Sequence, residues 1–196
     1  MSSGLRRFRE PPVRARPGER CEMCAEPLAA EHSHVIDLDG RSIMCACRGC
    51  YLLFTRPGAG RYRAVPRRYR YDPEFEAGQR LLDGAGIPVR MAFFFTNSRL
   101  ARPVAYYPSP AGATECLLPL DTADELATAF GGVEPDVEAL LLNGGEGFLV
   151  PIDTCYELVG LVRLHWRGFD GGTEAREALE EFFAGLRHRG EQAADG

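Results

Sequence analysis

The sequence contains no lysine, since all 23 of its basic residues are arginine. A GC-rich coding sequence favours arginine, alanine and glycine, and this explains the absence of lysine better than a chemical requirement does. The chain also has no stretch near the roughly 18 consecutive apolar residues that a membrane-spanning helix needs. Its arginine-rich start is followed by no apolar segment of the kind found in signal peptides. We therefore expect a folded protein of the cytoplasm.

Structural disulfides are a second feature that we do not expect. A reducing cytosol disfavours disulfides and leaves closely spaced thiols to metal binding or redox chemistry. The chain has seven cysteines, an odd number, so at least one thiol would stay unpaired. Five of these cysteines and two of the four histidines lie within residues 21–50. This segment is therefore the candidate functional site.

The net charge of −5 conceals a difference between the two parts of the chain. Residues 1–70 contain 14 arginines and 7 acidic residues, a balance of +7, whereas residues 71–196 contain 9 arginines and 21 acidic residues, a balance of −12. Residues 1–20 are polar, rich in arginine and interrupted by proline, which predicts a flexible arm. The positive part of the chain could steer an anionic partner toward the N-terminal residues.

Two CxxC pairs with 22 residues between them are a strong metal-site signal. Each two-residue gap lets one tight turn aim two sulfurs at a single ion. Between the pairs, HVIDL, DG and RSIMC read as strand, turn and strand, and CRGCYLLF predicts a helix whose N-terminus lowers the pKa of nearby thiols. This order resembles a treble-clef zinc finger and, less closely, a zinc ribbon. We predict a metal-binding module over residues 21–54 with four ligands, Cys21, Cys24, Cys47 and Cys50.

The spacing does not identify the metal. Zinc is the usual ion of a cytosolic four-cysteine site, and as a structural ion it would supply folding free energy to so small a module. Iron in a rubredoxin-like site would instead make the protein an electron carrier, although Ala25 and Tyr51 follow the pairs where rubredoxins have glycine. A cluster held by five thiols is a further alternative.

Cys45 and His34 are alternative ligands. Cys45 could replace Cys47 or lie next to the ligands, and spacing does not decide between these arrangements. His32 and His34 are two residues apart on the same side of the predicted strand, so they could supply a ligand or a second metal site. For His32 we expect solvation or an ordinary hydrogen bond, and His34 is the better candidate for a site role.

The rest of the sequence predicts an α+β protein with a mainly antiparallel sheet. Residues 55–87 read as a connector with a short helix near residues 73–82, residues 88–190 as an α+β domain, and residues 191–196 as a tail. Within the domain we expect strands at 89–95, 103–107, 115–120, 147–152 and 156–166, and helices at 125–130 after a Thr122–Glu125 capping box, at 135–143, and from an N-cap at Thr173 through Leu186.

Other motifs give weaker signals. Residues 61–71, RYRAVPRRYRY, alternate arginine with tyrosine as in proteins that bind single-stranded nucleic acid, but a solvated connector in this chain would look the same. Zinc-finger binding of nucleic acid therefore stays an alternative function. Cys116 and Cys155 stand alone among apolar residues, which is typical of small buried side chains. No GxSxG motif or comparable catalytic spacing is present, so the sequence indicates no enzyme activity.

Three passages together resemble an uncharacterised bacterial family. They are CEMC with EHSHVIDLDGRSIMCACRGCYLLF, AFFFTNS with AYYPSPAGATECLLPL, and EPDVEALLLN with VPIDTCYELVGLVRLHWRGFDGG. The family is common in actinobacteria, and its genes often lie beside those for nickel-iron uptake hydrogenases. The resemblance implies an accessory or assembly role for such a hydrogenase, with the hydrogenase or its maturation factors as partner. It implies no catalytic residues.

Overall fold

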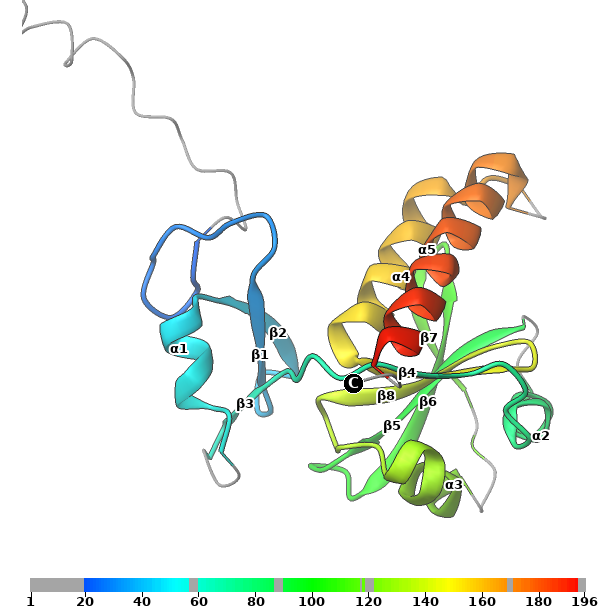
Figure 1. The fold of residues 1–196 in the computed structure, drawn as a ribbon, viewed down its shortest axis with the longest axis horizontal. Helices are drawn as coiled ribbons and strands as arrows, with labels where there is room; N and C mark the ends of the chain where they lie inside the picture. The colour runs from blue at the N-terminus through cyan, green and yellow to red at the C-terminus, as the bar shows by residue number, and fades with distance from the viewer. Residues whose placement is uncertain are drawn as a thin grey trace, which may run out of the picture.

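The computed structural model of the chain describes residues 20–56, 60–86, 90–116, 118, 122–168 and 171–193. Within these ranges the chain forms two antiparallel sheets, and helices pack on the larger one (Figure 1). Apart from Arg20, the predicted arm lies outside the described residues. No helix in the described ranges is long and apolar enough to cross a membrane. The predicted α+β class with antiparallel sheets is confirmed.

The smaller sheet belongs to the N-terminal part of the chain and has the order β2-β1-β3. Its strands are β1 (Ser33–Asp37), β2 (Ser42–Ala46) and β3 (Tyr62–Ala64). At the β1–β2 turn, Asp37 Oδ1 accepts hydrogen bonds from the backbone N–H groups of Asp39 and Gly40, at 3.1 and 3.0 Å. Helix α1 (Arg48–Leu53) follows β2 almost at once. The predicted hairpin and the predicted helix after Cys47 are therefore both present.

The larger sheet has six strands in the order β4-β9-β8-β5-β6-β7, and all paired neighbours are antiparallel. Two of the predicted strands, at 89–95 and 103–107, correspond to β5 and β6. Part of the predicted strand at 115–120 lies outside the described residues. The strands are β4 (Arg70–Asp72), β5 (Met91–Asn97), β6 (Arg102–Ser109), β7 (Gly112–Cys116), β8 (Glu138–Asn143) and β9 (Glu146–Pro151).

Helices cover both faces of this sheet. On one face, α4 (Ile152–His165) and α5 (Gly172–Gln192) pack against a cluster that includes Phe93 and Leu141. On the other face, α2 (Gly78–Gly84), α3 (Thr122–Thr128) and the short 3-10 helix η2 (Ala129–Gly131) pack against a cluster that includes Phe94 and Leu140. Successive residues of β5 and β8 therefore enter opposite cores, which explains the continuous apolar runs of these strands.

The predicted helix over residues 135–143 is wrong, because this segment forms strand β8. Asn143 and the two glycines after it resemble a helix stop, yet they form the turn of the β8–β9 hairpin, with Gly144 at φ 61°. Every residue from Glu138 to Leu142 is buried. A strand that is buried on both faces shows no alternation of polar and apolar residues, so its period cannot distinguish it from a buried helix.

The predicted strand over residues 156–166 is also wrong, because these residues belong to helix α4 except for its C-cap, Trp166. Alternation placed Tyr156 and Leu164 in the core, but their exposed fractions are 45% and 62%. The buried residues of α4 recur instead at helical spacing, and they include Cys155, Leu158, Val159 and Val162.

Two helix boundaries also differ from the prediction. The C-terminal helix is present as α5, but its N-cap is Gly171, with φ 84°, and Thr173 lies within the helix. This left-handed backbone suits glycine, whereas the sequence pattern favoured a threonine cap. The helix predicted near residues 73–82 begins later, at Gly78.

The connector arginines bind carboxylates and carbonyls of the chain itself. Arg68 donates from Nε and Nη2 to Glu138, at 2.8 and 2.6 Å, and only 1% of the Glu138 side chain is exposed. Arg63 donates to the carbonyl of Pro135 at 2.8 Å, and Arg61 pairs with Asp37. Ile36 and Val65 add apolar contacts to the core under α4 and α5. The Arg61–Asp37 pair lies within the smaller sheet, and the other contacts fasten that sheet to the larger one.

We expect Gly190→Ala to destabilise the protein. A Cβ atom at this position would lie 2.5 Å from Cβ and 2.9 Å from the backbone nitrogen of Tyr71, where α5 crosses β4. Overpacking of this kind lowers the free energy of unfolding by about 1–3 kcal/mol. Gly185→Ala in the same helix is the control, because the nearest contact, at 3.7 Å, is the end of the Arg189 side chain. It should raise stability by up to about 1 kcal/mol in urea unfolding, and equal effects of the two changes would contradict the prediction.

We expect Glu146 to contribute to stability in a pH-dependent way. Hydrogen bonds from Arg187, at 2.7 and 2.8 Å, and from Tyr71, at 2.8 Å, lower the pKa of Glu146 below its ordinary value of 4.5 despite partial burial. This stabilisation is complete above the ordinary pKa and is lost as pH falls through the folded-state pKa. Glu146→Gln should therefore flatten the decline of unfolding free energy below about pH 4.5, whereas Glu177→Gln on the exposed side of α5 should not. Equal slopes for Glu146→Gln and wild type would disprove this role.

Candidate metal centre

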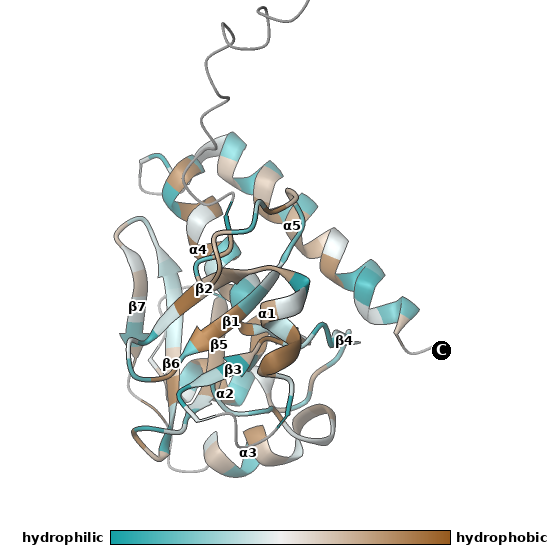
Figure 2. Cartoon of the chain, turned by 90° about the vertical axis from the view of Figure 1, so that its left-hand side faces the viewer, coloured by the Kyte–Doolittle hydropathy of each residue, from teal (hydrophilic) through white to brown (hydrophobic). Residues whose placement is uncertain are grey.

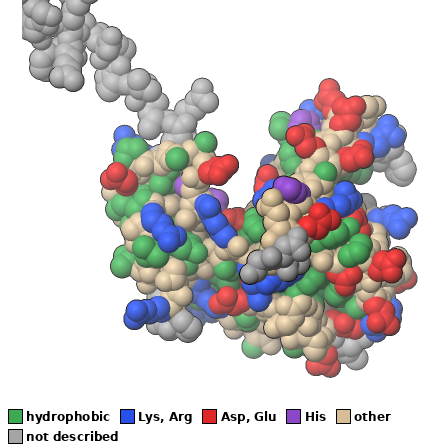
Figure 3. Space-filling view, in the orientation of Figure 1, with side chains coloured by type: hydrophobic (Ala, Val, Ile, Leu, Met, Phe, Trp, Pro, Cys, Tyr) green, Lys and Arg blue, Asp and Glu red, His purple; other side chains and the backbone are tan. Residues whose placement is uncertain are grey.

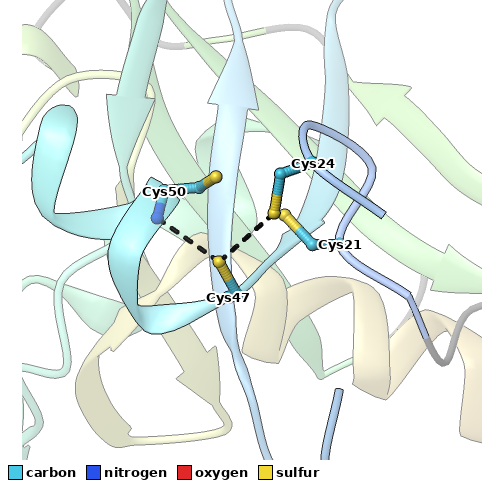
Figure 4. Close-up of side chains that lie close together, drawn as sticks. All are labelled: Cys21, Cys24, Cys47 and Cys50. Carbon is cyan, nitrogen blue, oxygen red and sulfur yellow. Dashed lines mark hydrogen bonds between the residues drawn. The ribbon is translucent and has the colours of Figure 1, made fainter. Parts of the chain in front are cut away.

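The four predicted cysteine ligands lie together. One sulfur atom from each of Cys21, Cys24, Cys47 and Cys50 lies within 4.8 Å of every other, and the sulfurs of Cys24 and Cys47 are 3.6 Å apart. Figure 4 shows the first pair on the loop before β1 and the second pair at the start of α1, with the sulfur atoms pointing toward one another. All four are free thiols. The arrangement could hold one metal ion at its centre.

The first pair lies on a tight turn closed by backbone hydrogen bonds. The N–H of Ala25 donates to the carbonyl of Cys21 at 2.8 Å, and the N–H of Cys21 donates to the carbonyl of Glu26, also at 2.8 Å. Ala25 has a left-handed backbone with φ 63°, a conformation that glycine adopts more readily. Ala25 therefore takes the position that glycine has in typical CxxCG knuckles. A knuckle turn forms here although the sequence lacks that glycine.

The second pair is positioned by the first turn of α1. Cys47 is the N-cap, and its sulfur accepts a hydrogen bond from the N–H of Cys50 at 3.4 Å. The N–H of Tyr51 donates to the carbonyl of Cys47 at 2.9 Å, which begins the helical hydrogen bonding. A cysteine in the capping position thus has its sulfur fixed next to the sulfur of the residue three positions later.

The thiols of this cluster differ in acidity. Burial by itself raises the pKa of Cys21, but hydrogen bonds from the backbone of Cys47, Cys24 and Met23 lower it to about 6. Hydrogen bonding to Cys24 and then burial raise the pKa of Cys50 to about 12. One thiol therefore ionises readily while a neighbour holds its proton. Because metals bind thiolates, an ion entering the cluster would displace the remaining protons.

Cys45 does not belong to the four-sulfur cluster. It lies on β2 opposite His34, and it forms a separate group with His32 and His34. Glu22 in the first knuckle holds the backbone of Cys45. The Glu22 carboxylate accepts a hydrogen bond from the N–H of Cys45 at 2.5 Å, and the backbone N–H of Glu22 donates to the carbonyl of Cys45 at 2.9 Å. Burial and then the charge of Glu22 raise the pKa of the Cys45 thiol. The two alternative ligands therefore lie outside the cluster, in a group of their own.

The structure adds Asp153, a residue that the sequence did not indicate. His34 Nδ1 and Asp153 Oδ2 are 2.7 Å apart, although 119 positions separate them in the chain. Asp153 lies in the first turn of α4, and its Oδ1 accepts from the N–H of Thr154 at 2.8 Å. No short-range sequence signal could identify this pair, because the two residues are far apart in the chain. In addition, the sequence predicted a strand at 156–166, within the helix that carries Asp153.

The two isolated cysteines lie apart from these groups. Cys155 is completely buried in α4, and burial raises the pKa of its thiol well above the ordinary value. Burial also raises the pKa of Cys116, whose sulfur lies 3.7 Å from the carbonyl of Thr114. Cys155 is therefore the small buried side chain that the sequence predicted, whereas Cys116 is only half-buried at the edge of the second core.

The comparisons with known proteins identify a family. No match was found among curated proteins, and none among solved structures. A family of unknown function, DUF5947, matches residues 20–190. The match includes both CxxC pairs, the His32–His34 segment and both sheets. Because it covers most of the sequence, the chain belongs to the DUF5947 family.

Proposed function

We propose that Cys21, Cys24, Cys47 and Cys50 hold one structural zinc ion in a cytoplasmic, non-catalytic accessory protein. The observation that carries the proposal is the convergence of four sulfurs from two separate chain segments. Four protein thiolates complete a tetrahedral coordination sphere, which leaves no position for a substrate and is typical of structural zinc. The knuckle, hairpin and helix start are consistent with the treble-clef arrangement that the sequence resembles.

The poor core of the N-terminal part supports a structural role for the ion. Among residues 20–56, the buried apolar side chains are Cys21, Val35, Ile36 and Ala46, and α1 contains no buried residue. So few apolar contacts cannot hold a knuckle, a hairpin and a helix together, whereas zinc supplies folding free energy directly.

We propose further that the partner is a protein, and that α1 contacts it. Leu52 and Leu53 are 50% and 69% exposed, next to the cysteine cluster. Figure 2 shows the later part of α1 in the colour of hydrophobic residues, on the side of the molecule that faces the viewer. The resemblance of the sequence to a hydrogenase-associated family supports a nickel-iron hydrogenase, or its maturation factors, as this partner.

We expect protein prepared without added metal to retain about one equivalent of zinc after dialysis against a mild chelator. Cys24→Ser and Cys50→Ser should lose this zinc, whereas Cys116→Ser is the matched control and should keep it. Elemental analysis measures the zinc content, and the visible spectrum detects iron. A red protein that bleaches with dithionite would establish iron and electron transfer instead, and a folded, reduced protein without metal would refute the proposal.

Removal of the ion should unfold the N-terminal part alone. We expect hydrogen exchange to become faster in β1, β2 and α1 after treatment with a strong chelator, while β5 and β8 stay protected by the two cores of the larger sheet. Unchanged exchange in all five elements would show that the ion has no structural role.

Charge introduced on α1 should weaken binding to the partner. We expect tagged wild-type protein to co-purify with subunits of a nickel-iron hydrogenase from cells that make one, and Leu53→Glu to reduce their recovery at least about tenfold. Leu164→Glu is the matched control, because Leu164 is 62% exposed on a different helix, α4. Zinc content should be the same in all three proteins. Equal recovery with wild type and Leu53→Glu would exclude α1 as the contact surface.

A further inference from the structure

A second group of metal-binding side chains lies beside the four-sulfur cluster. One ligand atom from each of His32, His34 and Cys45 lies within 4.8 Å of the other two. The β1–β2 register pairs His34 directly with Cys45, and His32 precedes His34 by two residues. Cross-strand partners and residues two apart point to the same face of a sheet. The hairpin therefore brings His34 and Cys45 together, and His32, directly before β1, lies beside them.

Hydrogen bonds at Nδ1 leave Nε2 of both imidazoles as the nitrogen that could bind a metal. Nδ1 of His34 lies 2.7 Å from a carboxylate oxygen of Asp153, and Nδ1 of His32 lies 3.0 Å from the carbonyl oxygen of Ala29. Both oxygens only accept hydrogen bonds, so each Nδ1 carries the proton and donates it. In the neutral rings the lone pair is then on Nε2. Metal-binding histidines show this arrangement, with the second nitrogen bound to a carboxylate or a carbonyl.

Nε2 of His32 has no partner among the described residues. The atom is buried, and no hydrogen-bond donor or acceptor in the described ranges contacts it. A buried polar atom without a partner destabilises the folded protein. The two rings lie close to each other, with centroids 4.9 Å apart and an interplanar angle of 61°. The ring that carries this unpartnered nitrogen therefore lies next to two other metal-binding side chains, and a bound ion would give the nitrogen a partner.

The group lies next to a large open cavity. His32, His34 and Asp153 line a cavity of about 700 Å³ together with Arg67 and Glu157. Figure 3 shows a hollow between the part that carries β1 and the part that carries α4 and α5. Three protein ligands leave a fourth position of a tetrahedral ion free, and zinc sites of this kind bind water or a small ligand there.

We propose that His32, His34 and Cys45 form a second metal site, for a divalent ion of the zinc class, with one coordination position open to the cavity. Two imidazoles and one thiolate suit Zn²⁺ and its substitute Co²⁺. Asp153 is a positioning residue, since it orients His34 and does not touch the ion. The site goes beyond the structural zinc proposed above and uses other ligands, but it rests on that proposal, because the structural ion holds the hairpin that brings His34 and Cys45 together.

Cobalt titration tests this site. Co²⁺ is added without oxygen to protein whose tightly bound metal has been quantified, and the visible spectrum is recorded. We expect one further equivalent of tetrahedral Co²⁺ with a single thiolate-to-cobalt charge-transfer band. His32→Gln, His34→Gln and Cys45→Ser should each weaken this binding at least about tenfold, whereas His188→Gln, which changes an exposed histidine, should not.

Asp153→Asn separates positioning from simple stabilisation. It should weaken cobalt binding by roughly 10- to 100-fold. The melting temperature of the protein without cobalt and its content of tightly bound zinc should stay the same. His32→Gln provides a second variant at the edge of the hairpin in case Cys45→Ser does not fold. If wild type that retains its tightly bound zinc takes up no more Co²⁺ than His32→Gln does, the second site is refuted, whereas loss of that zinc from wild type would refute the proposed function instead.

Azide tests the open position. Added to the cobalt-loaded protein, it should change the spectrum of wild type by binding the free position that faces the cavity. It should have no effect on the His32→Gln variant, in which the four-sulfur cluster is the remaining site. An unchanged wild-type spectrum at saturating azide would overturn the open position and leave a closed site.

Discussion

The convergence of four cysteine sulfurs is the constraint on which the N-terminal part of the structure depends. The knuckle before β1 and the first turn of α1 bring these four sulfurs together, and α1 buries no residue of its own. The backbone supports the cluster from both sides, through the turn that closes at Ala25 and through the cysteine cap of α1. Everything that the hairpin then presents, including Cys45 and the two histidines, is held in place by this arrangement.

The hairpin is also fastened at its other side. Ile36 enters the core beneath α4 and α5, Arg68 reaches the buried Glu138, and His34 is hydrogen bonded to Asp153. The N-terminal part therefore packs against the larger sheet and shares its core through Ile36. This attachment places the four-cysteine group and the cavity beside α4 in one continuous structure. It also uses several connector arginines within the chain, which favours a structural role for the RYRAVPRRYRY segment over contact with nucleic acid.

Two groups of candidate ligands with different properties lie close together. Four thiols around one centre make a closed site that suits a structural ion, whereas two imidazoles and a thiol beside a cavity make an open one. Glu22 connects them, because it lies between the cysteines of the first pair and binds the backbone of Cys45 at the same time. Folding of the knuckle thus helps to place a residue of the second group.

The sequence by itself determined the features that depend on short-range geometry. The CxxC spacing, the Asp-Gly turn and the amphipathic C-terminal helix each involve residues within one or two turns of chain, so the four-cysteine group, the β1–β2 hairpin and α5 could be predicted. Only the tertiary structure decided that the apolar run of β8 is a strand, because burial on both faces removes the period that distinguishes strand from helix. In α4 the apolar residues also alternate along the sequence, and only packing decided that Tyr156 and Leu164 are exposed while the residues at helical spacing are buried. The same holds for His34 and Asp153: 119 positions separate them, and their contact exists only because the hairpin packs against the start of α4.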